Sequence, residues 1–495
     1  MAAVAQRTDG AVLALDVGTS SCRASLYDRR GRLVGPRRGR VAYAPAVTPD
    51  GGAELDAELL FDHVCVAIDQ VLTENTTPVL AVATDTFWHS LLGVGADGRP
   101  VTPVYLWLDA RSRGEVAGLR QRLDERAAHA RVGCVFHWSY WPAKLSWLRR
   151  AQPDLFTSKR VYRWISFGEL VLERLTGHTG TSVSMASGTG LLNVHSCDWD
   201  AELLDALQLT REHLGALVPL RQTATATQAA IKRWPSLEDV PWLPAVGDGG
   251  CSNLGAGCAT ADRFAVMIGT SGAERVVWAP PEPFEVAWGT WCYRVDERRT
   301  VVGGAMNDGG SLLDWLRVTL RLPSLQTAER ALAALEPDGH GLMVLPLWGG
   351  ERSPGWADDA RGAIVGLRLH TQPIEILRAC LEAVALRFGE LDQILLKAMP
   401  NVREVVATGG ALLHSPTWMQ IVADVLGRPL LASAEPEASS RGVALLGLET
   451  LGLLHQPLDA MQPSVRRRFD PRPANTERYR AAAERQRHLY DLLVK

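Results

Sequence analysis

A chain of 495 residues with a formal net charge of −3 is too long for one ordinary hydrophobic core, so we expect two large domains. The small net charge gives no electrostatic reason to expect a nucleic acid or an anionic membrane as a partner. No segment approaches 18 consecutive uncharged apolar residues, which argues against a membrane span. The eight cysteines are scattered without a C-x-x-C pair, and the start lacks the apolar core of a signal peptide. We therefore expect reduced thiols and a cytoplasmic protein.

The first element is an apolar strand, residues 11–15, that ends at Asp16 and Gly18 and then returns as a second strand. Three hydroxyl residues occupy the tip: Thr19, Ser20 and Ser21. Their hydroxyls and the N–H groups of the turn are typical of a small phosphate site. An acid at the end of an apolar strand needs a partner, water or a cation, and Asp16 would suit Mg²⁺ with its water ligands. For this stretch alone, a plain hairpin with a polar tip is the alternative.

The same pattern returns at residues 264–278, where Gly269-Thr270-Ser271-Gly272 separates two apolar strands. Two such hairpins, one opening each half, indicate duplicated domains that hold a nucleotide triphosphate between them. The chain has no G-x-x-x-x-G-K-[ST] loop, so it is not a P-loop enzyme. A further amphipathic helix is predicted over residues 373–399, which begin with a proline and keep apolar residues at helical spacing.

Four further segments place polar groups or glycines at turns or strand ends. Asp248 is predicted on a glycine turn within residues 243–257, where it could accept a proton from an attacking alcohol, although Asp-Gly turns are common. Trp88 and His89 follow a strand, and aromatic faces with polar tips suit a sugar, although a lone histidine is more often structural. Gly310 and Gly410 each precede a predicted helix, where backbone can approach a ring or a phosphate; a tight turn is the alternative.

These elements, in this order, resemble the FGGY carbohydrate kinases, a branch of the actin-like ATPase superfamily, over nearly the whole chain. Further matching motifs are SYWPAKLSWLRR, SMASGTGLLN, GERSPGWADDARGAIVGL and EPEASSRGVALLGL. The resemblance implies an α/β fold in which two RNase H-like domains flank a deep interdomain cleft. Residues 1–257 would hold the sugar site, the first phosphate hairpin and the catalytic acid. Residues 258–495 would hold the second phosphate hairpin and the adenosine site.

The resemblance also implies roles for single residues, with ATP and Mg²⁺ as cofactors. Asp248 matches the general base, and the sugar-binding positions are Trp88, His89, Asp248 and Gly249. Asp16 matches a metal-binding acid, directly or through water. The phosphate- and nucleoside-binding positions are Asp16, Thr19, Ser20, Ser21, Thr270, Gly310, Gly410 and His414.

The segments WHSLLGV, GGAMNDGG and GERSPGW look most like those of gluconate kinases. Xylulose kinases usually carry glutamine where this chain has Phe87, and the arginine–glutamate pair of glycerol kinases is replaced by Trp88-His89. Gluconate is therefore the expected substrate, and a pentulose or another polyol is the alternative. The carboxylate of gluconate would need a cationic partner, for which His89, Lys144 and Arg352 are candidates. A non-catalytic sugar or nucleotide sensor is the rival of a different class, and a homodimer is one assembly that the resemblance implies.

Overall fold

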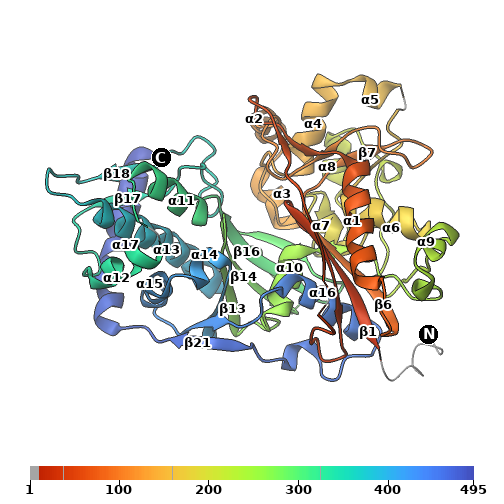
Figure 1. Ribbon diagram of the computed structural model, residues 1–495. Helices are drawn as coiled ribbons and strands as arrows, with labels where there is room; N and C mark the ends of the chain where they lie inside the picture. Colours follow the sequence, from red (N-terminus) through yellow and green to blue (C-terminus); the bar gives the residue numbers. More distant parts are fainter. Residues whose placement is uncertain (1–9, 37, 159, 282, 324) are drawn as a thin grey trace.

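The computed structural model describes residues 10–36, 38–158, 160–281, 283–323 and 325–495. Two lobes lie side by side, each built on a β-sheet with helices packed against it (Figure 1). Within the described residues, every helix is too short or too polar to span a bilayer. The fold is a mixed α/β architecture of two lobes, as expected.

The first lobe is built on a five-stranded sheet in the order β3-β2-β1-β6-β12. Its strands are β1 (Ala11–Val17), β2 (Ser21–Tyr27), β3 (Gly39–Ala42), β6 (Val79–Thr86) and β12 (Val246–Gly247). The pairs β1–β2 and β2–β3 are antiparallel, whereas β6 runs parallel to β1 and to β12. All seven residues of β1 are buried, which explains why residues 11–15 form a continuous apolar run rather than an alternating one.

The second lobe repeats this arrangement inside a seven-stranded sheet, β15-β16-β14-β13-β19-β20-β21. Its strands are β13 (Arg263–Ile268), β14 (Gly272–Trp278), β15 (Trp291–Arg294), β16 (Thr300–Met306), β19 (Glu404–Thr408), β20 (Leu430–Ser433) and β21 (Val465–Phe469). The central order β16-β14-β13-β19-β20 has the same strand directions as the first sheet. The duplication predicted from the two hairpins is therefore confirmed.

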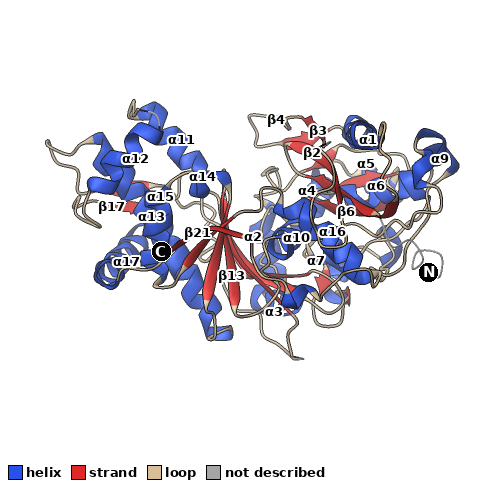
Figure 2. Cartoon of the chain, turned by 60° about the horizontal axis from the view of Figure 1, so that its bottom comes forward, coloured by secondary structure: helices blue, strands red, loops and turns tan. Residues whose placement is uncertain are grey.

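Helices cover both sheets, and the larger sheet stands between the first lobe and the helices α13 and α17 (Figure 2). Among the longer helices are α1 (Ala57–Leu72), α13 (Pro373–Ala398), α15 (Pro416–Leu426) and α17 (Pro473–Leu493). Helix α13 confirms the predicted helix to within one residue, because Pro373 starts it and Gln372 and Glu375 form a reciprocal cap. The other helices of at least four residues are α2 (Glu115–Arg122), α3 (Glu125–Val132), α4 (Trp141–Ala151), α5 (Asp154–Thr157), α6 (Phe167–Thr176), α7 (Val183–Ser187), α8 (Ala201–Ala206), α9 (Gln228–Arg233), α10 (Asp248–Gly255), α11 (Gly310–Thr319), α12 (Leu325–Ala334), α14 (Gly410–Leu413) and α16 (Ala438–Thr450). The short strands are β4 (Ala46–Val47), β5 (Ala53–Leu55), β7 (Leu92–Val94), β8 (Val104–Tyr105), β9 (Arg163–Ile165), β10 (Leu192–Asn193), β11 (Asp198–Trp199), β17 (Met343–Leu345) and β18 (Ala363–Val365).

Helices α10 and α16 cross at very short range and join the two halves of the chain. A Cβ atom on Gly442 would lie 1.8 Å from the Cys251 carbonyl oxygen, and one on Gly255 would lie 1.8 Å from the Ala438 carbonyl oxygen. Although α16 comes late in the sequence, it packs on β1 and β6 of the first lobe (Figure 1). A division of the chain between residues 257 and 258 would assign α16 to the second domain, although α16 packs on the first sheet. The predicted boundary therefore remains a prediction.

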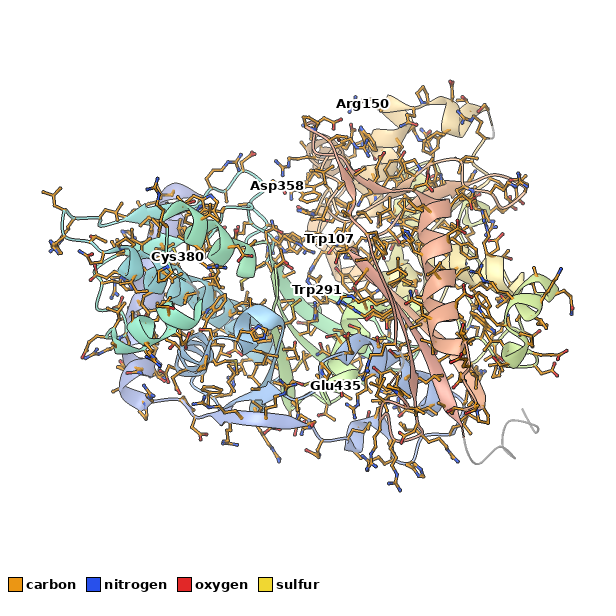
Figure 3. All side chains as sticks on the ribbon, viewed as in Figure 1. Trp107, Arg150, Trp291, Asp358, Cys380 and Glu435 are labelled. Carbon is orange, nitrogen blue, oxygen red and sulfur yellow. The ribbon has the colours of Figure 1, made fainter. Side chains whose placement is uncertain are left out.

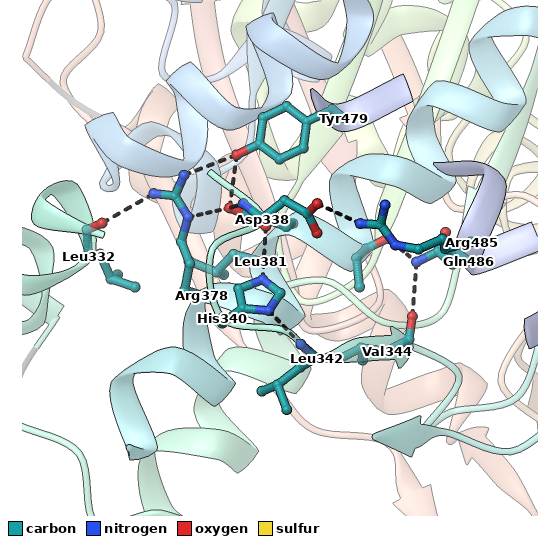
Figure 4. A network of polar contacts seen from close by, with 12 residues as sticks. Leu332, Asp338, His340, Leu342, Val344, Arg378, Leu381, Tyr479, Arg485 and Gln486 are labelled. Atoms are coloured by element: carbon teal, nitrogen blue, oxygen red, sulfur yellow. Dashed lines mark hydrogen bonds and ion pairs between the residues drawn. The ribbon is translucent and has the colours of Figure 1, made fainter. Parts of the chain in front are cut away.

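A buried polar network anchors the C-terminal helix α17 to α13 (Figure 4). Asp338, His340 and Glu382 lie close enough together to ligate a metal ion. Each carboxylate already has a guanidinium partner, however: Arg378 binds Glu382 and Arg485 binds Asp338, each at 2.5 Å. The Tyr479 hydroxyl also donates to Glu382 at 2.9 Å. These pairings satisfy the carboxylates, so the cluster is a structural network.

Candidate active site

A cavity of about 200 Å³ lies between the lobes and draws its walls from both. The first lobe and helix α10 contribute Thr19, Phe87, Trp88, His89, Trp107, Asp248 and Gly249. The second lobe contributes Met267, Ser271, Gly272, Ala273, Arg275, Trp291, Tyr293, Ala305 and Arg352. Figure 3 shows Trp107 and Trp291 in this space. The structure thus brings the predicted sugar positions, the proposed base and both hairpins to one cavity.

Trp88 forms a wall of the cavity, and two glycines leave room for its ring. The indole Nε1 donates to the Ser184 carbonyl oxygen at 2.9 Å. A Cβ atom on Gly247 would lie 1.8 Å from the ring, and one on Gly249 would lie 2.8 Å from it. The glycines around Asp248 therefore have a packing role that the sequence did not reveal.

Of the three predicted cations, the structure supports Arg352. His89 Nδ1 lies 2.5 Å from the Gly188 carbonyl oxygen, and burial lowers the pKa of the ring to about 3, so His89 is neutral at physiological pH. Burial therefore argues against His89 as the predicted cation, because it disfavours the charged ring. Lys144 is not among the described residues that line the cavity; its ammonium group donates to the Ser139 carbonyl oxygen, and burial lowers its pKa to about 7.

Asp248 is the first residue of helix α10, not part of an isolated glycine turn as predicted. Packing against α16 overrides the low helix propensity of its glycines. The Gly249 N–H donates to Asp248 Oδ1 at 2.8 Å. Burial raises the pKa of Asp248 to about 6, while the guanidinium of Arg275 opposes this rise. A carboxylate with this pKa is ionised near neutral pH and is still basic enough to accept a proton.

Asp16 lies at the end of β1, where its Oδ2 accepts hydrogen bonds from Arg23 and Ser440, each at 3.2 Å. Asp85, which sequence analysis missed, is its direct neighbour on β6. Burial, and then the charge of Asp16, raises the pKa of Asp85 well above its usual range. Among the described residues, both carboxylate oxygens of Asp85 lack a hydrogen-bond partner. This concentration of carboxylates fits a hard divalent cation such as Mg²⁺.

The three predicted hydroxyls of the first hairpin have different surroundings. Thr19 lines the cavity, and its Oγ1 accepts a hydrogen bond of 3.2 Å from Trp107 Nε1. Ser20 is exposed at the tip, and Ser21 is buried as the first residue of β2. Thr19 and Ser20 are therefore open to a ligand, whereas Ser21 is enclosed by the sheet.

The predicted nucleotide positions of the second lobe converge at the tip of the β13–β14 hairpin. The Gly310 N–H donates to the Gly269 carbonyl oxygen at 2.7 Å, and the Ser311 N–H donates to the Thr270 carbonyl oxygen at 3.0 Å. A Cβ atom on Gly310 would lie 2.8 Å from the Cβ of Ala411, in helix α14. The tip of the β13–β14 hairpin, the start of α11 and the start of α14 are thus packed against one another, without room for a side chain at Gly310.

Gly410 and His414 are exposed at the two ends of helix α14. A Cβ atom on Gly410 would lie 3.7 Å from the imidazole of His414. The Thr270 side chain is also exposed. The predicted nucleotide residues therefore surround an accessible surface beside the cavity, where they can contact a ligand.

Comparison with known proteins agrees with this geometry. The N-terminal domain of the FGGY family of carbohydrate kinases matches residues 11–255, and the C-terminal domain matches residues 264–450. A gluconokinase of Bacillus subtilis (strain 168) is 28% identical over 456 residues, which are 89% of this chain and 88% of the relative. The crystal structures of a gluconate kinase and of a ligand-bound xylulose kinase, both from Lactobacillus acidophilus, each have a TM-score of 0.91 and 27% identity, with 98% of both chains covered. The chain belongs to the FGGY family of carbohydrate kinases, which are ATP-dependent phosphotransferases.

Proposed function

We propose that this kinase transfers the γ-phosphoryl group of ATP to a hydroxyl of a small open-chain sugar acid, and that gluconate is its substrate. The observation that carries the proposal is Asp248, a carboxylate with a pKa of about 6 that lines the cavity between the lobes. Trp88 and Trp107 offer flat apolar walls to the sugar carbons, and Arg352 offers a positive charge. The similarity to gluconokinases supports the choice of sugar acid.

In this proposal, Asp248 accepts the proton of the attacking sugar hydroxyl, and Gly249 and Trp88 position the sugar beside it. Backbone N–H groups and the hydroxyls of Thr19, Ser20 and Thr270 stabilise charge on the transferring phosphoryl group, whereas the buried Ser21 supports the hairpin from within the sheet. Gly310, Gly410 and His414 contact the nucleoside. Asp16 holds Mg²⁺, directly or through water, and the ion neutralises phosphate charge when it is bound. Closing the cavity against water protects ATP from hydrolysis.

A kinase for a pentulose or another polyol is the second candidate, and one observation favours it. The ligand-bound xylulose kinase structure matches this chain with the same TM-score and identity as the gluconate kinase structure. A sensor that binds without catalysis would not need Asp248. We further propose that the enzyme acts in the cytoplasm, where ATP is available, and that it assembles as a homodimer.

The test is release of ADP with ATP and Mg²⁺ across aldonates, ketoses, aldoses and polyols, with Asp248→Asn as the control. We expect strong turnover with gluconate and its loss in the control. Turnover only with a ketose or a polyol would keep the kinase and overturn the choice of gluconate. ATP binding without turnover of any sugar would favour the sensor.

A further inference from the structure

Two arginine side chains enter the cavity from the second lobe, and neither has its charge fully paired. Arg275 comes from β14, near the hairpin tip, and Arg352 lies in the loop between β17 and β18. The Nε atoms of both are buried, and within the described part of the chain neither has a hydrogen-bond partner. A buried donor on a cationic group is costly unless a ligand satisfies it.

The two guanidinium groups are also near each other. Burial lowers the pKa of Arg275, Asp248 opposes this effect, and Arg352 adds to it by like-charge repulsion. Since arginine keeps its proton in proteins, both side chains remain cationic. Among the described lining residues, one carboxylate, Asp248, faces two guanidinium groups, while His89 is neutral. The cavity therefore has an excess of positive charge in the absence of substrate.

Arg275 lies on the sugar side of the cavity. A Cβ atom on Gly249 would lie 3.4 Å from Arg275 Nε and 2.8 Å from the ring of Trp88. Gly249 thus leaves open space between the proposed base segment, the guanidinium and the aromatic wall. The stem of Arg275 is supported from the other side, because a Cβ atom on Gly303 of β16 would lie 3.2 Å from its Cγ. The guanidinium of Arg275 thus reaches the part of the cavity that Trp88 and Gly249 line.

Arg352 lies over two aromatic faces, with its guanidinium carbon 5.5 Å from the ring centre of Trp107 and 6.0 Å from that of Trp356. Stacking on indole rings holds a guanidinium in a defined orientation while its edge stays available to an acceptor. Arg275 and Arg352 thus both bring guanidinium N–H donors to the cavity, and a guanidinium group can bind a carboxylate in a bidentate way.

We propose that Arg275, with Arg352 as its partner, binds the carboxylate of an anionic sugar and so sets a preference for sugar acids over neutral sugars. This inference rests on the proposed function, in which the cavity holds the sugar. The inference adds Arg275 as the residue that recognises the carboxylate of the sugar. It also places that carboxylate beside β14 of the second lobe. Substrate binding would then join the two lobes, because Trp88 of the first lobe and Asp248 of α10 line the same cavity.

The test compares gluconate with glucitol, in which an alcohol replaces the carboxylate. Arg275→Met keeps the apolar stem and removes the charge, and Arg275→Lys restores the charge without the planar fork. Arg298→Met, at an exposed position between β15 and β16, is the matched control. We expect Arg275→Met to lower kcat/KM for gluconate about 100-fold more than for glucitol, chiefly through KM, because a charge-assisted pair is lost. Arg275→Lys should recover part of the preference, and the control should keep it.

Binding of gluconate without ATP, followed by tryptophan fluorescence, separates this inference from the proposed function. Binding by the native chain that Arg275→Met loses would support the carboxylate site even if no sugar were phosphorylated. Equal losses of kcat/KM for gluconate and glucitol would overturn the inference, because Arg275 would then serve the transferring phosphoryl group. Turnover by the native chain of neutral sugars alone would also overturn it while leaving the kinase intact. If Arg275→Met fails to fold, Arg275→Lys and Arg352→Met decide between the same outcomes.

Discussion

Asp16 of β1 and Asp85 of β6 stand directly opposite each other on two adjacent parallel strands. Asp16 has Arg23 and Ser440 as partners, whereas both oxygens of Asp85 lack a partner among the described residues. Two carboxyl groups this close in a buried place are unfavourable for folding, since Asp85 is shielded from solvent and the charge of Arg23 offsets only part of the cost. Such a local conflict is expected where a site serves binding rather than stability.

Replacing Asp85 with asparagine should make the protein more stable in the absence of metal and nucleotide. The amide can donate to Asp16 and removes the repulsion, so we expect a gain of roughly 1–3 kcal/mol in the free energy of unfolding. Denaturant unfolding at pH 7.5 with EDTA measures it. Asp62→Asn, at an exposed position of α1, should leave the midpoint unchanged. A lower midpoint for Asp85→Asn would show that Asp85 has a stabilising partner.

Asp16 should set the magnesium requirement. With Asp16→Asn, we expect the Mg²⁺ concentration for half-maximal ADP release to rise about tenfold or more, because a carboxylate near the ion is lost. Binding of Mn²⁺ in the presence of ADP, followed by electron paramagnetic resonance, gives a readout without catalysis. An unchanged metal dependence in both measurements would remove Asp16 from the metal site.

Asp248 should control the acidic limb of the pH profile. Its pKa is raised to about 6 by burial, and a general base works only when ionised, so kcat/KM should fall about tenfold per pH unit below pH 6 and level off above it. Asp248→Asn should lower kcat roughly 10²–10⁴-fold and abolish this limb. The measurement is kcat/KM for the sugar from pH 5 to 8. A variant that keeps the same limb would assign it to another group.

Much of this site could be predicted because its signals are local in the chain. A strand, a glycine-hydroxyl tip and a returning strand are contiguous, so both hairpins and the position of Asp16 followed from pattern alone. Asp248 and Gly310 stood out for the same reason. The helical spacing of apolar residues likewise located α13, a helix of 26 residues.

The remaining features depend on contacts between distant segments, which local pattern does not encode. Tyr293 lines the cavity because its hydroxyl pairs with that of Tyr140, 2.6 Å away in the other lobe. Arg275 could have been noticed as a charged residue within an apolar strand, but only the position of Gly249 reveals which way it faces. The helical state of Asp248 depends on α16, nearly two hundred residues later in the sequence.

The crossing of α10 and α16 should tolerate no side chain, and Gly442→Ala tests this. A Cβ atom there would lie 1.8 Å from the carbonyl oxygen of Cys251, so one helix must move, at a cost of roughly 1–3 kcal/mol in the free energy of unfolding. Because α10 carries Asp248, the movement should also lower kcat in the folded variant. Gly118→Ala, in α2, is the matched control, since no described atom lies within 4 Å of its added Cβ.

The control should stabilise the protein by up to about 1 kcal/mol, as alanine is the better helix former. Denaturant unfolding and turnover, measured on both variants, separate the two effects of Gly442→Ala. Loss of stability with normal kcat would mean that α10 keeps its place and that α16 alone moves. Equal stability of Gly442→Ala and Gly118→Ala would contradict the close crossing itself.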